Sequence, residues 1–595
     1  MEDRKMINVI QSCSTNPLGI TGSPSTTLDI TIDIREATKQ ERALGQMVYV
    51  ILEEDGRNIL VIGQIISIET KNRWHEDPAF KGVIKRHGSL PHLSGTADNR
   101  IATISVQACY ELGGDKADGY ILGTSPSTGE HVHKMNNDVM KTIMQQHEKY
   151  ITYMGKVYGT DVDLPFWFKH FGKTIDGSNE IGAGDAFHIG VFGKTGSGKS
   201  VTATYMLLGY VKNKASMSIL VLDPQSQFYL DKELLPSGIK VGDKVKQIGM
   251  SYEKYKIVDD IYLPQDRIDI FAELLKNNGF IEEAFRPIYN TEKLDAMTSV
   301  VSDYLAGYAN KPGFDLGTTD RKKLLRDMLT SFAETRDGKK EGDVTYSKYV
   351  IRAWGTTTTR QRLVDRINTL LNNFDREKTV RTKWESAIEL FSPKKANGTN
   401  KKSFDYLIEK IVKKKGNFII LDIGPRQGEI ENENVQALFI HVLESKIVEA
   451  GAELYTHGIS ANCLIVMDEA HRFISKNAPD ERIKALTQEI IGSVRTTRKY
   501  GIGYMFITQT IESLDEEILR QMRIFALGYG LTTGQELRKV GEIINNPSAL
   551  QLYKSFIDPS SNRKFPFMFF GPISPLSFTG SPLFMEVYSD VTKFR

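Results

Sequence analysis

One segment of the chain, residues 193–200, limits the possible folds more than any other. It reads Gly-Lys-Thr-Gly-Ser-Gly-Lys-Ser and fits the pattern G-x-x-x-x-G-K-S. An apolar run, Phe187–Phe192, comes directly before it, and the residues after it, through about Lys212, have helical character. Glycines let the loop backbone curl so that several N–H groups converge on phosphate oxygens, and the following helix directs its positive end to the same charge. The segment therefore predicts a phosphate-binding loop between a strand and a helix.

The motif also assigns roles to its last two residues. Lys199 is expected to neutralise the β- and γ-phosphates of a nucleoside triphosphate, and the Ser200 hydroxyl is expected to bind Mg²⁺, a hard cation that takes oxygen ligands. The expected ligands are thus ATP and Mg²⁺. The predicted nucleotide-binding residues are Gly193, Lys194, Thr195, Gly196, Ser197, Gly198, Lys199, Ser200 and Val201.

A second apolar run ends in two carboxylates. Leu464–Met467 is followed by Asp468 and Glu469, and the carboxyl ends of parallel strands are where such sheets bind ligands. We expect Asp468 to hold the magnesium through water and Glu469 to polarise the water that attacks the γ-phosphate. His471, two residues later, has no second ligand at a suitable spacing, which favours a hydrogen-bonding role over metal binding.

Three further side chains are candidates for the same chemistry. Gln509 follows the apolar run Tyr504–Thr508 and either reports the position of phosphate or water through its amide, or is an ordinary surface glutamine. Arg495 and Arg498 are three residues apart and share a face if helical. One of them either reaches a neighbouring subunit's active site, where an arginine stabilises transition-state charge, or belongs to a solvated or ion-paired helix face.

The arrangement of apolar runs predicts an α/β fold with several domains. Short β-rich runs between residues 28 and 108, separated by Gly, Asp and Asn, indicate a small antiparallel barrel or sandwich over about the first 150 residues. From Phe187 the pattern changes to short apolar runs that alternate with helical stretches, as in a parallel sheet covered by helices. Almost two hundred residues between the second and third runs are charged and helical in propensity, which predicts an inserted helical domain. The predicted core strands are Phe187–Phe192, Ser218–Asp223, Phe418–Asp422, Cys463–Asp468, Tyr504–Thr508 and Ile524–Tyr529.

Composition excludes some classes of protein. The 76 Lys and Arg residues nearly balance the 74 Asp and Glu residues, so no global positive field indicates nucleic acid binding. The three cysteines lie far apart without a C-x-x-C spacing, which argues against a disulfide framework and against zinc and suits a reducing compartment. The sequence contains no run of about 18 apolar residues, the length that would predict a membrane span. We therefore expect a cytoplasmic protein that does not enter a membrane.

The ordered set of motifs resembles the HerA-like ATPases of the FtsK/HerA superfamily of ring-forming DNA pumps. The resemblance covers most of the chain. It includes the phosphate-binding loop, Leu222-Asp223-Pro224 after the second strand, and Asp468 to Arg472. It also includes the R-x-x-R-K-Y-G run, Arg495–Gly501, and Ile507-Thr508-Gln509.

The resemblance implies an architecture and a set of roles. It implies a RecA-like P-loop ATPase core with an N-terminal β-barrel and a helical insertion, assembled as a hexamer. It implies the same roles for Lys199, Ser200, Asp468 and Glu469, and trans stimulation by Arg495 or Arg498. The corresponding division is an N-terminal β-barrel at 1–160, the RecA-like core at 161–255 and 416–550, the helical insertion at 256–415 and a C-terminal brace at 551–595.

The same resemblance implies partners and a task. Members of this family thread double-stranded DNA through the ring and often act with a partner effector, such as a nuclease or, in anti-phage defence, a sirtuin-like NAD-consuming protein. The present chain departs from the family where Asp-Pro-His-Gly-Glu-Tyr is common, because it carries Gln227 in place of the carboxylate. Three functions remain open at this stage: a DNA translocase, a scaffold in which ATP binding organises a partner effector, and a secretion motor.

Overall fold

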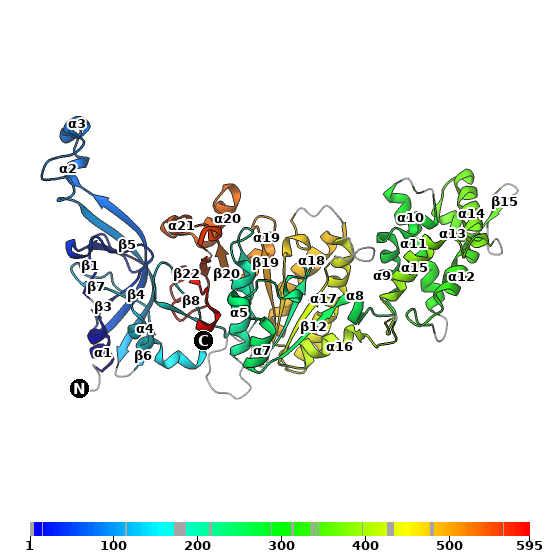
Figure 1. Ribbon diagram of the computed structural model, residues 1–595, viewed down its shortest axis with the longest axis horizontal. Helices are drawn as coiled ribbons and strands as arrows, with labels where there is room; N and C mark the ends of the chain where they lie inside the picture. The colour runs from blue at the N-terminus through cyan, green and yellow to red at the C-terminus, as the bar shows by residue number, and fades with distance from the viewer. Residues whose placement is uncertain are drawn as a thin grey trace.

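The computed structural model describes residues 5–14, 16–113, 116–171, 186–213, 217–286, 288, 290–310, 314–334, 339–341, 344–395, 397–424, 433–476, 481–562 and 564–595. The molecule is elongated (Figure 1). A β-barrel lies at one end, a large sheet with its helices in the middle, and a helical domain at the other end.

The N-terminal domain is a closed barrel of six antiparallel strands, which decides between the predicted barrel and sandwich. The ring closes because β2 pairs with β5 as well as with β1. Alternate residues such as Ile30 and Ile32 point into the barrel and are fully buried there, as their period-two pattern predicts. The strands are, in order around the ring, β2 (Asp29–Ile34), β1 (Gly19–Thr21), β7 (His131–Lys134), β3 (Met47–Glu54), β4 (Arg57–Lys71) and β5 (Asn99–Gly113), and β6 (Lys116–Tyr120) adds to β5.

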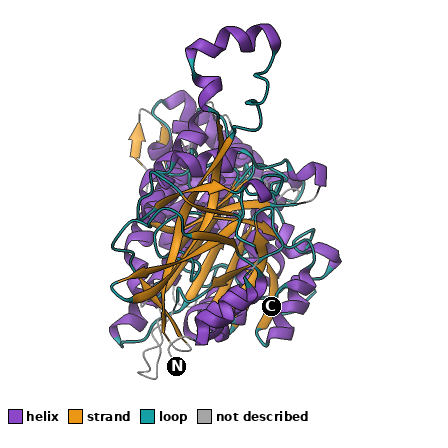
Figure 2. Cartoon of the chain, turned by 90° about the vertical axis from the view of Figure 1, so that its left-hand side faces the viewer, coloured by secondary structure: helices purple, strands orange, loops and turns teal. Residues whose placement is uncertain are grey.

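The connection between β4 and β5 carries a helical tip away from the barrel. It contains α2 (Arg73–Glu76) and α3 (Pro78–His87), which have no buried residues. Figure 2, viewed from the barrel end, shows these helices standing clear of the other elements. Two Asx caps hold their local geometry, from Asn72 for α2 and Asp77 for α3.

The central sheet has seven parallel strands followed by four antiparallel ones. The parallel strands are, in spatial order, β12 (Ser251–Lys256), β17 (Asn417–Asp422), β11 (Ser218–Asp223), β18 (Cys463–Met467), β19 (Ile502–Thr508), β10 (His188–Phe192) and β20 (Met522–Gly528). All six predicted core strands are present within two residues at either end. The strands β10, β11, β17, β18 and β19 are buried along their whole length, as expected of a parallel sheet covered on both faces.

Helices cover the two faces of this sheet. On one face α5 (Lys199–Lys212) packs with Leu464 and Val466 of β18. On the other face α17 (Glu433–Thr456) and α18 (Glu481–Thr496) pack with Ile465 and Met467 of the same strand. Alternate residues of one buried strand thus supply both hydrophobic layers.

The sequence analysis did not predict one of the parallel strands, β12. The edge strand β12 reads Ser-Tyr-Glu-Lys-Tyr-Lys and is partly exposed along most of its length. Edge strands commonly carry lysine, which discourages pairing with other chains, and therefore lack the apolar run of central strands.

The antiparallel strands join the C-terminus to the N-terminal region. After β20 come β21 (Pro566–Phe570), β22 (Leu583–Val587), β8 (Ile151–Val157) and β9 (Asp163–Trp167). Residues 151–157, which the sequence analysis grouped with the barrel, are thus a strand of the large sheet. The C-terminal segment pairs with β20 and β8 of its own chain.

The helical domain is inserted between β12 and β17. A short parallel pair, β13 (Ile261–Tyr262) with β16 (Lys402–Ser403), lies where the chain enters and leaves it. Its core includes the fully buried Trp384, whose ring contacts those of Phe271 and Phe280. The main helices are α9 (Ile268–Asn277), α10 (Phe280–Ala284), α11 (Thr291–Ala309), α12 (Arg321–Ala333), α13 (Lys348–Ala353), α14 (Thr357–Asn372) and α15 (Lys378–Glu389).

Candidate active site

The predicted phosphate-binding loop connects β10 to α5 at the carboxyl edge of the sheet. Its backbone takes the left-handed region at Gly198, with φ of 88°, which favours glycine. A Cβ at Gly193 would lie 2.5 Å from the Ser197 hydroxyl, so the loop is too tight there for a side chain. The Ser197 hydroxyl is buried and has no hydrogen-bond partner among the described residues. The loop is thus closely folded around an interior polar atom.

Lys199 begins α5 and is 8% exposed. Its Nζ donates to the carbonyl of Lys194 at 3.2 Å, inside the loop. Burial lowers the pKa of Lys199, while the nearby carboxylates of Glu469 and Asp468 raise it. The ammonium group is therefore held beside the loop, where a bound phosphate would exchange the weak carbonyl contact for a charge-assisted one.

The sheet order separates the loop from the acidic pair by one strand. β19 lies between β10 and β18, and all three run parallel. Their carboxyl ends therefore meet at one edge, where Asp468 and Glu469 follow β18 and Gln509 follows β19. The acidic pair and the loop therefore lie at the same edge of the sheet, one strand apart.

Asp468 is almost completely buried, at 3% exposure. Its Oδ1 accepts from the backbone N–H of Glu469 at 3.0 Å, and its Oδ2 has no hydrogen-bond partner among the described residues. Burial, together with the charges of Glu469 and Asp223, raises the pKa of Asp468 to about 7. A buried carboxylate oxygen without a partner costs free energy, so this atom suits a ligand that the fold itself does not supply.

Glu469 has an unusual backbone for its residue type, with φ of 47°. Non-glycine residues in this region cost about 1 kcal/mol or more and concentrate at functional sites. The conformation turns the carboxylate toward β19, where Gln509 Nε2 donates to both of its oxygens at 3.2 and 3.3 Å. His471 Nδ1 lies 3.3 Å from Glu469 Oε2, and burial lowers the pKa of His471.

Gln509 connects the loop to the acidic pair. While its amide nitrogen donates to Glu469, its Oε1 accepts from the Thr195 hydroxyl at 3.0 Å. A hydrogen-bonded line therefore runs from the phosphate-binding loop through Gln509 to Glu469. A phosphate that moved Thr195 or Gln509 would change the position of the Glu469 carboxylate.

The turn after β11 also contributes to this edge, which the sequence analysis did not predict. Ser200 Oγ donates to Gln227 Oε1 at 3.0 Å, so Gln227 contacts the hydroxyl expected to bind magnesium. Asp223 accepts from three backbone N–H groups of the turn, those of Gln225, Gln227 and Tyr229, at 2.7–3.3 Å. Burial raises the pKa of Asp223 to about 6. The Asp-Pro pair that signals this turn thus positions Gln227 through its backbone.

The two predicted arginines lie at the opposite edge of the same sheet. Arg495 is in the last turn of α18, and Arg498 is in the short helix Thr497–Tyr500, which leads into the start of β19. Arg495 forms an ion pair with Glu517 of α19 (Glu516–Gln521). The carbonyl of Arg498 accepts from Ala186 N, just before β10. Because β10 and β19 are parallel, both arginines are a strand length away from the phosphate-binding loop of their own chain.

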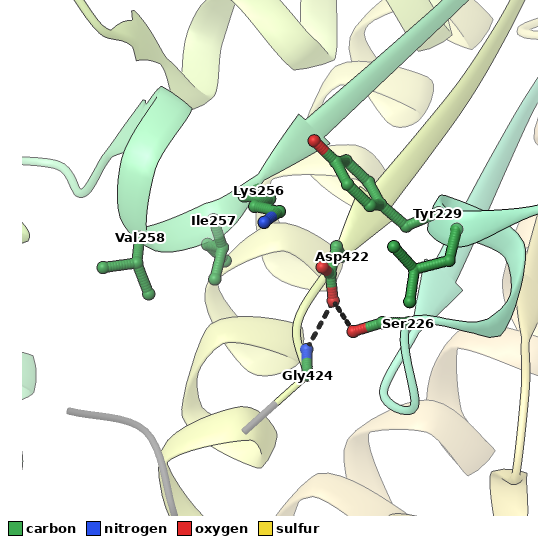
Figure 3. A pocket seen from close by; sticks show the side chains of 8 residues that line it. Ser226, Tyr229, Lys256, Ile257, Val258, Asp422 and Gly424 are labelled. Atoms are coloured by element: carbon green, nitrogen blue, oxygen red, sulfur yellow. Dashed lines mark hydrogen bonds between the residues drawn. The ribbon is translucent and has the colours of Figure 1, made fainter. Parts of the chain in front are cut away.

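A pocket lies near the acidic edge but does not include the loop (Figure 3). It has a volume of about 150 Å³ and lies between the turn after β11, the end of β12 and the end of β17. Asp422 points between its hydrogen-bond partners, the Ser226 hydroxyl and the Gly424 N–H, both at 2.9 Å. Lys256 lies over the ring of Tyr229, 5.1 Å from its centroid. Its walls come from β11, β17 and β12, which are one, two and three strands further from β10 than β18, the strand that leads to Asp468.

Comparison with known families identifies the core. Residues 185–447 match the family model described as Helicase HerA, central domain. This segment of the chain therefore matches the central domain of the HerA-like ATPases. Its β10 and α5, with the loop between them, and its inserted helical domain all fall within the matched range.

Two proteins described as DNA double-strand break repair helicase HerA are similar to this chain. That of Saccharolobus solfataricus is 20% identical over 402 residues, 67% of this chain and 62% of the relative. That of Sulfurisphaera tokodaii is 25% identical over 209 residues, 34% of this chain and 38% of the relative. The matched region thus spans less than two thirds of either relative. VirB4 of Thermoanaerobacter pseudethanolicus is a similar solved structure, 13% identical, with a TM-score of 0.36 over 75% of this chain and 98% of VirB4.

Metal clusters and membrane-spanning helices are two further features that the described residues could contain. Within the described ranges, no group of three or more His, Cys, Asp and Glu side chains is arranged to hold a metal ion. Magnesium in nucleotide sites is held by one or two protein oxygens together with phosphates and water, so it needs no such group. None of the helices in the described ranges combines the length and the apolar character that a membrane span requires.

Proposed function

We propose that this HerA-like chain forms a ring that hydrolyses Mg-ATP and uses the free energy to move along double-stranded DNA. The observation that carries the proposal is the line of contacts from Thr195 through Gln509 to Glu469. It joins a loop of phosphate-binding sequence to a carboxylate that can polarise water. A site that only bound nucleotide would need no such carboxylate beside the loop.

The roles of the residues follow from where they lie. The N–H groups of residues 193–201 and the ammonium of Lys199 would hold the phosphates. Glu469 would accept a proton from the attacking water, and Gln509 would hold that carboxylate in place until the terminal phosphate is present.

Magnesium fits the residues at the acidic edge. Among the described residues, Asp468 Oδ2 is buried without a partner, and Ser200 Oγ donates to the neutral amide oxygen of Gln227. Both are hard oxygen donors of the kind that Mg²⁺ prefers. When bound, the ion would neutralise phosphate charge, and Ser200 and Asp468 would orient it, Asp468 through water.

A ring explains the position of the arginines. Because Arg495 and Arg498 are at the far edge of the sheet, neither can stabilise charge at its own loop, whereas a neighbouring copy could present either one. We propose a homo-oligomer, and a hexamer on the resemblance to the family. The same resemblance suggests a cytoplasmic protein with a partner effector, a nuclease or a sirtuin-like NAD-consuming protein, in DNA processing or anti-phage defence.

The variant Glu469→Gln tests the proposal. It is expected to bind Mg-ATP normally but to hydrolyse it about 10²–10⁴-fold more slowly, because the general base is lost. ATPase rates with and without linear duplex DNA would be measured for both proteins, and the wild-type rate is expected to rise with DNA. Glu512→Gln, in the loop after β19, is a matched control that should leave the rate unchanged.

Two outcomes would argue against the motor. If DNA does not change the wild-type rate, and Glu469→Gln supports the activity of the purified partner as well as the wild type does, ATP binding organises the partner and hydrolysis is secondary. If Glu469→Gln hydrolyses ATP at the wild-type rate, Glu469 is not the general base.

A further inference from the structure

Phe565, which leads into β21, lies directly against the phosphate-binding loop. A Cβ added to Gly198 would come within 2.5 Å of the Phe565 ring, so the ring covers the Cα of that glycine. The backbone of Phe565 is fixed by a 3.0 Å hydrogen bond from Val587 N to its carbonyl. Its side chain is half-buried and packs with the cluster on the α5 face of the sheet. Part of an aromatic ring is therefore accessible beside the loop.

The sheet order fixes which part of a nucleotide could reach this ring. The groups that would meet the terminal phosphate, Asp468, Glu469 and Gln509, follow β18 and β19 on one side of β10. On the other side of β10 lie β20 and then β21. A triphosphate whose terminal phosphate points to Glu469 directs its nucleoside toward β20 and β21, the side where Phe565 lies.

The chemistry of this side favours a base rather than a further phosphate. The Phe565 ring is uncharged. The adjacent cation, Lys564, forms an ion pair with Glu586, with 3.3 Å between Nζ and Oε1. Aromatic side chains bind nucleobases by stacking on the π face, and the contact tolerates different bases. The half-buried ring beside a phosphate-binding loop has the properties of such a surface.

We propose that Phe565 is the platform on which the base of the bound nucleotide stacks. This inference rests on the proposed function, because it assumes that the loop holds a nucleoside triphosphate. It assigns a nucleotide contact to the C-terminal segment. The segment continues through β22, where Gln64 of the barrel accepts from Phe584 N at 3.1 Å, so the platform belongs to the strands that join core and barrel.

The test compares a nucleotide with a ligand that has no base. Binding of Mg-ATP and of magnesium tripolyphosphate would be measured by calorimetry for wild type, Phe565→Ala and Phe565→Trp. The affinity of Phe565→Ala for ATP is expected to fall by about 5- to 150-fold, the range found when an aromatic residue that stacks on a base is removed. Its affinity for tripolyphosphate should not change, and Phe565→Trp should bind ATP as tightly as the wild type.

Two further variants distinguish stacking of Phe565 on the base from packing of Phe565 against the loop. Phe565→Leu keeps an apolar side chain against Gly198 without a π face and should resemble Phe565→Ala. Phe578→Ala removes a 47% exposed phenylalanine from the same segment, whose ring contacts Tyr110, and should leave both affinities unchanged.

Three results would overturn the inference. An equal loss of ATP and tripolyphosphate binding would make Phe565 a support for the loop, and unchanged ATP binding in Phe565→Ala would exclude any contact with the base. Wild-type binding of Phe565→Leu to ATP would show that only packing matters. If the wild type binds neither ligand, the proposed function itself fails, and this result differs from the other three.

Discussion

The two edges of the parallel sheet each contain a buried carboxyl group, and these two groups differ in the hydrogen-bond partners that surround them. At the carboxyl edge, one oxygen of Asp468 has no partner in the part of the chain that the structure describes, and Glu469 beside it has a left-handed backbone. At the amino edge, the fully buried Glu444 of α17 accepts from the Tyr504 hydroxyl. Burial raises the pKa of Asp468 and of Glu444 to about 7 in each case.

At the amino edge, Glu444, Tyr504 and His188 find their hydrogen-bond partners within the protein. Tyr504 N donates to His188 Nδ1 at 3.2 Å, so the proton is on Nε2, which donates to the carbonyl of Val494 at 2.9 Å. Burial lowers the pKa of His188 to about 4, which keeps the ring neutral. A satisfied network of this kind stabilises one packing arrangement, whereas an unsatisfied one indicates a place for a ligand.

The difference between the two edges has its largest expected effect in the assembled ring. If the amino edge of one subunit faces the carboxyl edge of the next, Arg495→Ala or Arg498→Ala should reduce ATP hydrolysis by about 10³-fold, as loss of a trans-acting arginine does. Mixing the affected variant with Glu469→Gln should restore part of the activity, because some interfaces then combine an intact arginine with an intact base. ATPase rates across mixing ratios measure this.

Arg520→Ala is a matched control, since Arg520 is exposed and lies near the same surface, 3.8 Å from Glu516. It should not alter the rate. Absence of any recovery in the mixtures would mean that the sites are not shared between subunits.

A smaller effect concerns stability without ligands. Raised pKa values mean that the folded protein binds more protons than the unfolded chain between about pH 4 and pH 7, so each carboxyl lowers stability as pH rises through that window. Asp468→Asn and Glu444→Gln remove this penalty. At pH 8 the first should be more stable than wild type by up to about 4 kcal/mol and the second by up to about 3 kcal/mol, and both differences should shrink to about 1 kcal/mol or less at pH 4.5.

Thermal unfolding at pH 4.5 and pH 8 measures these differences, and a second series with Mg-ATP distinguishes the two edges. Wild type and Glu444→Gln should be stabilised by the nucleotide, since a ligand that binds only the folded state raises its stability. Asp468→Asn should lose most of that gain. Equal behaviour of the two variants with Mg-ATP would remove the distinction between the edges.

Much of this arrangement could be predicted from sequence because its signals are local. The phosphate-binding loop, the acidic pair and the six apolar core strands are each encoded within fewer than ten consecutive residues. The expected α/β fold with a RecA-like core, barrel and helical insertion is confirmed. The roles of Asp468, Glu469 and the loop stay predictions.

What sequence could not supply depends on contacts between distant segments. The strand β12 has no apolar run. The strand β8 belongs to the large sheet because it pairs with β22, and the paired residues Val157 and Met585 are 428 positions apart in the sequence. The contacts of Gln227 with Ser200 and of Phe565 with Gly198 arise from the same folding of distant segments. The sequence shows that Gln227 replaces the carboxylate of the family, but it does not show that Gln227 contacts Ser200.

The most direct test of the central claim is an experimentally determined structure with magnesium and a non-hydrolysable ATP analogue. The account predicts that the phosphates lie within residues 193–200, that the ion lies between Ser200 and Asp468, and that the terminal phosphate faces Glu469 and Gln509. Nucleotide density in the pocket between Ser226 and Asp422, with the loop empty, would contradict it.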